Sequence, residues 1–354
     1  MSTDTLIEDS ANRLFAEQVG KAQREQAEQG GLDAALWQQV ADAGFPLLLA
    51  REASGGFGQG WTAAYPLLRG LGYWQVPLPL AETMVASLLA SMAGFDLPSG
   101  PLTLIEQGCG NDLVVDGLRV TGTAHAVPWA RHAQAALVSL ADGRLGLLPL
   151  GGAAGVQLRP HANLAGLPSD TLVLQGAVVS AMAACPLALA QPAWTLGALA
   201  RSAMMVGALE SALEQAVRYA GERVQFGKPI GRNQAIQQNL ALMAGDVAAA
   251  RTATLAAMAD APDSQARDAI ATRFSTAVAK VRAGEAASRG TGIAHQVHGA
   301  IGFTHEHALH FATRRLWSWR EEFGTDAHWA AELGRAAILA RASGFWPAIT
   351  RKHF

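Results

Sequence analysis

The segment Arg223-Val-Gln-Phe-Gly-Lys-Pro-Ile230 separates two alanine-rich helical runs and combines a cation, an aromatic ring, a glycine and a proline. Each type has an ordinary structural explanation. The helix dipole favours a cation in the last turn, an aromatic ring can anchor a core, and glycine and proline commonly mark helix ends. A guanidinium also offers a rigid fork of donors that suits phosphate oxygens. The segment is therefore compatible with a plain helix break or with an anion site.

A second segment, Gln296-Val-His-Gly-Ala-Ile-Gly-Phe-Thr-His-Glu306, is rich in small residues and follows another helical run. Glycines at such a place let the backbone approach a ligand closely. Their spacing does not match the glycine fingerprints of Rossmann or P-loop proteins. If the two segments bind a nucleotide, they do so without a Rossmann or P-loop glycine motif.

Read together, ERVQFGKPIGRNQAIQ and QVHGAIGFTHEHALHFATRR resemble the two flavin-contacting signatures of the acyl-CoA dehydrogenase family, at about their usual separation. The resemblance covers most of the chain. LWQQVADAGFPLLLAREASGGFGQGW is similar to the family's N-terminal helical segment, and GLRVTGTAHAVPWARHAQAALVSL is similar to its middle β-domain. In style the chain is most similar to bacterial members that degrade sterols and other CoA thioesters.

The resemblance implies FAD as the cofactor and Arg223 as the residue that binds its pyrophosphate. The Gln296 segment would lie against the FAD of a neighbouring subunit, so that the two segments hold one dinucleotide from opposite sides of a subunit boundary. The residues implied to contact FAD are Arg223, Gln225, Phe226, Ile230, Asn233, Gln296, Gly299, Ala300 and Thr325.

The expected catalytic base is missing. Dehydrogenation of an acyl-CoA needs a base for the α-proton, donors for the thioester oxygen and a flavin that accepts the β-hydride. The family uses a carboxylate as base, but an ungapped count from Gln296 puts Phe323 at its usual position. Some members carry the base on the helix before the Arg223 segment instead, and an ungapped count there puts Gly197 at that position. Glu322 is the remaining candidate. One step along a helix turns a side chain by about 100°, so Glu322 is no automatic substitute, and its residue type and neighbours favour a solvated surface charge over a catalytic base.

The middle region departs from the family as well. Members carry a threonine-glutamate-proline turn followed by a glycine-serine-aspartate stretch, which together cover the flavin and the thioester. Here PLTLIEQGCGNDLVV runs through this region, and we expect the wall on the substrate side to be shortened.

Three functions fit these features. The chain could be an FAD-dependent acyl-CoA dehydrogenase whose base is displaced, a non-catalytic partner in a heteromeric dehydrogenase, or a relative that oxidises a different bond such as carbon–nitrogen. The resemblance implies an acyl-CoA substrate and an electron-transfer flavoprotein as acceptor. It also implies a tetramer, either of identical chains or with a sister chain.

Hydrophobic periodicity gives the expected order of elements. Helical spacing dominates residues 1–98, short apolar runs broken by glycine and proline fill residues 99–180, and helical spacing returns over residues 181–354. With the resemblance, this order predicts a mainly α protein of the acyl-CoA dehydrogenase fold. Its domains would be an N-terminal helical domain, a middle β-barrel-like domain and a C-terminal four-helix bundle.

Composition narrows the class of ligand. Charged residues make up 16% of the chain and the net charge is −2, which favours neither nucleic acid nor an anionic membrane. Cys109 and Cys185 lie far apart and form no metal-binding motif or disulfide framework. Because the N-terminal residues are polar and acidic, we expect a cytoplasmic protein without a membrane-inserted segment.

Overall fold

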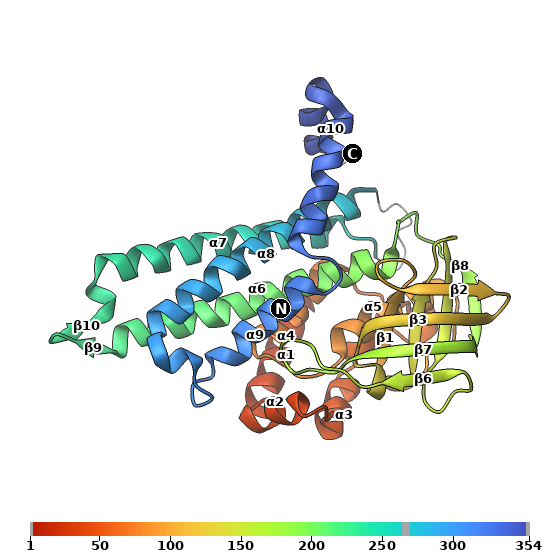
Figure 1. Cartoon of the computed structure of the whole chain (residues 1–354), viewed down its shortest axis with the longest axis horizontal. Helices are drawn as coiled ribbons and strands as arrows, with labels where there is room; N and C mark the ends of the chain where they lie inside the picture. Colours follow the sequence, from red (N-terminus) through yellow and green to blue (C-terminus); the bar gives the residue numbers. More distant parts are fainter. Residues whose placement is uncertain (1–2, 264–269, 352–354) are drawn as a thin grey trace.

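The computed structural model describes residues 3–263 and 270–351. Its N-terminal helices are α1 (Thr3–Gln18), α2 (Lys21–Glu28), α3 (Ala34–Asp42), α4 (Trp61–Tyr73) and α5 (Leu80–Met92). After the strands come α6 (Pro192–Glu222), α7 (Gln234–Asp260), α8 (Ile270–His298), α9 (Leu309–Glu321) and α10 (Asp326–Arg351). The fold is mainly α with a small β-domain, as the sequence predicts, and the long helices and the strands lie at opposite ends of the molecule (Figure 1).

The β-domain consists of two four-stranded sheets. One has the order β1-β4-β5-β8 and the other β2-β3-β7-β6, and a shared hydrophobic core draws residues from both. The strands are β1 (Leu102–Glu106), β2 (Asp112–Asp116), β3 (Arg119–Pro128), β4 (Ala135–Ser139), β5 (Arg144–Pro149), β6 (Val156–Arg159), β7 (Ser169–Val178) and β8 (Ala181–Ala184). Strand β8 falls just beyond residue 180, and the division of the chain at residues 98 and 180 stays a prediction.

Helix α6 is the central element of the helical region. It packs against α4, α8 and α9, and most of its residues are buried. Small residues allow this density: a Cβ built on Gly207 would lie 1.9 Å from the carbonyl oxygen of Arg69, and one on Gly72 would lie 1.7 Å from that of Met204. Because neither site has room for a methyl group, α4 and α6 approach each other backbone to backbone.

The direction of the chain reverses twice after α6. The short hairpin of β9 (Val224–Gln225) and β10 (Lys228–Pro229) leads into α7, which runs back alongside α6, and α8 then returns. The C-terminal ends of α6 and α8 therefore lie at the same end of the bundle, far from the β-domain (Figure 1).

Two helices in the described part of the chain, α6 and α7, are long and apolar enough to cross a membrane by length and composition alone. The apolar window of α6 is 83% buried, whereas that of α7 is only 28% buried. Helix α10 projects from the body (Figure 1) and exposes Ile338, Leu339 and Trp346. In the single chain, apolar surface therefore remains uncovered on α7 and α10.

The close crossing of α4 and α6 predicts a position-specific effect of one methyl group. Gly207→Ala must push the helices apart and should lower the free energy of unfolding by at least about 1–3 kcal/mol. Gly221→Ala is the matched control, because its Cβ meets nothing within 4 Å and alanine favours the same helix. Urea denaturation followed by circular dichroism measures both changes. Equal free energies of unfolding for the two variants would contradict the close packing of α4 against α6 at Gly207.

Candidate functional site

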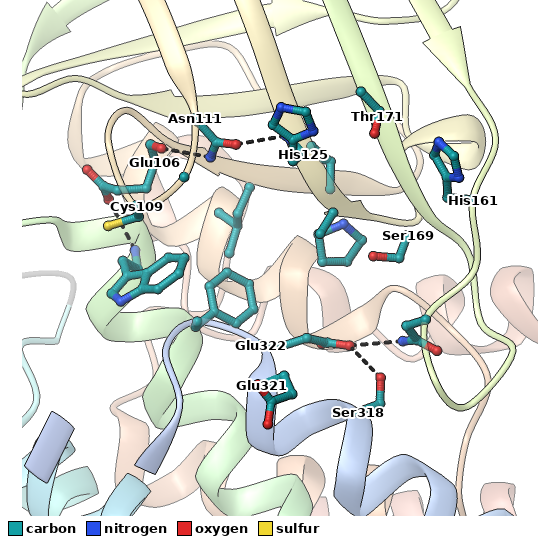
Figure 2. Close-up of a pocket in the computed structure, with 18 of the residues that line it drawn as sticks. Glu106, Cys109, Asn111, His125, His161, Ser169, Thr171, Ser318, Glu321 and Glu322 are labelled. Carbon is teal, nitrogen blue, oxygen red and sulfur yellow. Dashed lines mark hydrogen bonds between the residues drawn. The ribbon is translucent and has the colours of Figure 1, made fainter. Parts of the chain in front are cut away.

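A cavity of about 700 Å³ lies between the β-domain, the start of α6 and the end of α9 (Figure 2). Strands β3 and β7 supply one side, with His125 and Thr171. The last residue of β1 supplies Glu106, the turn after it supplies Cys109, and the residue that follows α9 supplies Glu322. The pairing of β3 with β7 shifts register between Ala124 and Val127, and this irregularity is where His125 enters the cavity lining.

The two positions predicted for the base touch each other. A Cβ built on Gly197 would lie 2.6 Å from Cδ1 of Phe323, so the phenyl ring occupies the space that a side chain at 197 would need. Phe323 has φ 54°, and its carbonyl oxygen accepts a hydrogen bond from Trp329 Nε1 at 3.0 Å. The ring therefore lines the cavity at the place where the family's carboxylate is expected.

Glu322 is held by three neighbours. Arg201 Nε lies 2.7 Å from Glu322 Oε2, while Asn163 Nδ2 and Ser318 Oγ donate to Oε1 at 2.9 and 3.2 Å. Arg201 also pairs with the buried Glu82. Burial lowers the pKa of Arg201, but the two carboxylates outweigh it and the pKa is raised overall. Glu322 thus neutralises the buried guanidinium of Arg201 and is not available to abstract the α-proton of a substrate.

Glu106 is a carboxylate that sequence reasoning missed. It is buried, accepts a hydrogen bond from Ser139 Oγ at 2.8 Å, and accepts another from the backbone N–H of Trp194 at 3.1 Å, in the first turn of α6. Burial raises its pKa to about 7, against the lowering effect of these hydrogen bonds. Both oxygens are engaged, so the group fastens β1 to the N-terminus of α6.

The turn after β1 is closed by hydrogen bonds, and the expectation of a shortened wall on the substrate side stays a prediction. Gly108 and Asn111 form a bridge, Asn111 Nδ2 donates to the carbonyl oxygen of Glu106 at 2.9 Å, and Asn111 Oδ1 accepts from the backbone of His125 at 2.8 Å.

Lys280, on α8, is fully buried against the last turn of α9. Its ammonium group donates to the carbonyl oxygens of Trp319 and Arg320, each at 2.8 Å, in the last turn of α9. Burial lowers its pKa to about 7, and the nearby carboxylate of Glu322 opposes this shift. The lysine therefore fixes the end of α9, from which Glu322 and Phe323 extend.

A second hollow, of about 480 Å³, lies at the far end of the bundle. It gathers seven of the nine residues predicted to contact FAD, all at the ends of α6, α7 and α8: Arg223, Gln225, Ile230, Asn233, Gln296, Gly299 and Ala300. Within the described part of the chain, the side chain of the exposed Arg223 has no ion pair or hydrogen bond. A free guanidinium beside exposed amides and an open glycine backbone fits the pyrophosphate of a dinucleotide.

Two predicted residues do not line this hollow. Phe226 is 99% exposed at the tip of the hairpin, with φ 52°. Thr325 Oγ1 accepts from the backbone N–H of His328 at 2.9 Å and caps the start of α10, away from the hollow. Neither residue contacts the site in a single chain.

The structure corrects the expectation that Arg223 and the Gln296 segment approach from opposite sides of a subunit boundary. Both line the same hollow of one chain, because α7 and α8 each reverse direction and bring the end of α8 back to the end of α6. Helix α6 has 31 residues and separates this hollow from the cavity by roughly 45 Å. This distance exceeds the length of a dinucleotide, so one FAD cannot reach both sites of the same chain.

The fold places this chain in a family of flavin-dependent oxidoreductases. The chain belongs to the acyl-CoA dehydrogenase family, and its residues 187–338 match the model of the acyl-CoA dehydrogenase C-terminal domain. Acyl-CoA dehydrogenase IpdE2 of Mycobacterium tuberculosis (strain ATCC 25618 / H37Rv) is 30% identical over 325 residues, which cover 88% of this chain and 89% of the relative.

Solved structures with the same fold include heteromers. A variant of the Tcur3481-Tcur3483 steroid ACAD superposes with a TM-score of 0.83 at 25% identity, covering 96% of this chain and 98% of that chain. The ChsE4-ChsE5 complex of Mycobacterium tuberculosis superposes with a TM-score of 0.82 at 24% identity, with the same coverage.

The buried carboxyl of Glu106 predicts a pH-dependent stability. Its pKa of about 7 exceeds the 4.5 of an unfolded carboxyl, so its contribution is fully present below pH 4.5 and is lost as the pH rises through 7. Glu106→Gln should flatten the decline in the free energy of unfolding across this interval. Urea denaturation over the pH range tests it, with the exposed Glu17→Gln as control. Parallel curves for Glu106→Gln and wild type would show that the site is not coupled to protonation.

Proposed function

We propose that this chain is the non-catalytic subunit of a heteromeric FAD-dependent acyl-CoA dehydrogenase. In this function the hollow at Arg223 holds the nucleotide part of a flavin whose ring lies in the cavity of a sister chain, and that chain carries the carboxylate base. The observation that carries the proposal is that Gly197 and Phe323, at the two expected positions of the base, pack against each other and neither carries a carboxylate.

The neighbouring carboxylates do not replace that base. Glu322 is paired with Arg201, which also neutralises Glu82, and breaking this pair would leave a buried cation with only one partner. Glu106 is engaged at both oxygens by Ser139 and the start of α6. A base must be free to approach the α-carbon, and these hydrogen bonds and the ion pair hold both carboxylates on other groups of the protein.

The hollow supplies the other half of the proposal. FAD, when bound, accepts the β-hydride of the acyl group and passes electrons on to an electron-transfer flavoprotein. Arg223 would pair with the pyrophosphate, and the side chains of Gln225 and Gln296 would bond to the rest of the nucleotide. The separation of hollow and cavity along α6 requires that the flavin ring served by this hollow lies in another chain.

The relatives support a heteromer. The Tcur3481-Tcur3483 steroid ACAD and the ChsE4-ChsE5 complex each pair two differently named chains. The apolar surface left open on α7 and α10 is consistent with such a partner. A homomeric dehydrogenase with a displaced base is the alternative.

Arg223→Gln should raise the dissociation constant of FAD for the assembled protein by about 10- to 100-fold, because charge-assisted hydrogen bonds to phosphate are lost. Arg223→Lys should fall between this variant and wild type, because lysine keeps the charge but not the fork. Quenching of FAD fluorescence measures the affinity. Arg232→Gln is the control, since this cation lies in the same connection but outside the hollow. A similar loss of FAD affinity in Arg223→Gln and Arg232→Gln would mean that the total positive charge of this connection, and not a specific contact of Arg223, determines the affinity.

The purified chain alone, mixed with FAD under anaerobic conditions, should not bleach the flavin absorbance when butyryl-CoA or longer acyl-CoA thioesters are added. Bleaching should require co-expression with a family member that carries glutamate at the position of Phe323. Loss of the flavin band in the chain alone would overturn the proposal in favour of a homomeric dehydrogenase. The same spectra, recorded before substrate is added, report whether flavin is retained.

A further inference from the structure

Three rings form a cluster at the wall of the Arg223 hollow. Tyr219, in the last turn of α6, stacks on His298, the last residue of α8, with ring centroids 4.7 Å apart and an interplanar angle of 26°. His307, in the segment that leads into α9, meets the His298 ring edge to face at 4.6 Å. Tyr219 and His298 both line the hollow. The cluster therefore places a pair of imidazoles next to the predicted nucleotide site.

The hydrogen bonds of the two imidazoles determine which ring nitrogens can take up a proton. His298 Nδ1 lies 2.7 Å from the carbonyl oxygen of Ala294 and so donates to it, whereas the buried Nε2 has no partner in the described part of the chain. His307 Nδ1 accepts from the backbone N–H of Leu309 at 3.1 Å. Protonation of His298 would add an N–H at a buried nitrogen without an acceptor. The protein by itself therefore favours the neutral form of His298.

The charges around the imidazoles act in the same direction. Burial is the largest cause that lowers the pKa of His298, and the cations His307 and Arg218 lower it further, against the raising effect of the bond to the backbone. Burial and Arg218 also lower the pKa of His307. His295, about one turn earlier on α8, has its pKa lowered by burial and by His298. Among the described residues, every charged group that shifts these pKa values is a cation, so the cluster lacks a negative charge.

We propose that the His298–His307 pair takes up a proton when a pyrophosphate binds in the hollow, so that nucleotide affinity rises as the pH falls. The phosphate charges supply the negative charge that the cluster lacks, and burial of His298 strengthens their attraction to an imidazolium. Because the two rings are in contact, they titrate as a unit and share one proton.

This inference rests on the proposed function, because it adds regulation to the same hollow. Arg223 keeps its charge at every relevant pH and supplies the part of the affinity that does not depend on pH. Binding raises the pKa of the imidazole pair. The additional affinity is therefore fully present below the lowered pKa of the free protein and is lost as the pH rises through the pKa of the complex.

The test uses ADP-ribose, which carries a pyrophosphate that does not titrate near neutral pH and lacks the flavin ring. In isothermal titration calorimetry with the full-length chain, its dissociation constant should be about three- to tenfold lower at about pH 6 than at about pH 8. The binding enthalpies in PIPES and in Bis-Tris at about pH 6.5 should differ in proportion to about 0.5 proton taken up. Equal dissociation constants at both pH values would overturn the inference and leave the hollow a nucleotide site. Absence of binding at either pH would contradict the proposed function as well.

A double variant, His298→Asn with His307→Asn, locates the proton. Asparagine can still donate to Ala294 at the first position and still accept from Leu309 at the second, but it does not titrate. This variant should bind ADP-ribose equally well at both pH values. His305→Asn is the matched control, because this exposed histidine belongs to the same segment and does not line the hollow.

The control should keep the full pH dependence of the wild type. Circular dichroism verifies that each variant is folded, and if the double variant is not, the buffer dependence of the binding enthalpy in the wild type decides the question alone. A pH dependence that persists in the double variant, or that disappears in His305→Asn, would contradict the assignment of the proton to the His298–His307 pair.

Discussion

A single buried helix constrains everything else in this structure. Helix α6 crosses α4 so closely that two glycines, Gly72 and Gly207, are required at the contact, and most of its residues are enclosed by the surrounding helices. Such a packed element cannot bend to bring its ends together. Its first turns carry Trp194 and Gly197 at the cavity, and Arg223 follows its last turn at the hollow. The separation of the two sites is therefore a fixed property of the chain.

The buried charges around the cavity explain why a nearby glutamate is no substitute for the missing base. Arg201 lies one turn after Gly197, and its guanidinium carbon is 5.5 Å from the centre of the Phe323 ring. A buried cation needs paired carboxylates, and here Glu82 and Glu322 fill this role. Proton abstraction by Glu322 would remove one of the two charges that stabilise the guanidinium. The same ion pairs that stabilise the fold thus oppose catalysis by this residue.

Much of the fold followed from the sequence, because hydrophobic period and turn residues are local signals. The change from helical to strand spacing and back matches the order of the elements, and the segments at Arg223 and Gln296 were recognised from their residues alone. Their meeting in one chain was not foreseen, because it depends on two chain reversals that periodicity does not encode. The engagement of Glu106 and Glu322 was also hidden, since it arises from partners as distant in sequence as Ser139 and Arg201.

The length of α6 has a consequence for how such chains diverge. If the hollow of each chain serves a flavin whose ring lies in another chain, substitutions at the two ends of α6 act on different reaction centres. After a gene duplication, one copy can lose its acid–base chemistry at Gly197 and Phe323 while selection still preserves its nucleotide contacts for the benefit of the other copy. In such lineages we expect amino-acid substitutions to accumulate at the end of α6 that carries Gly197, while the end next to Arg223 stays conserved.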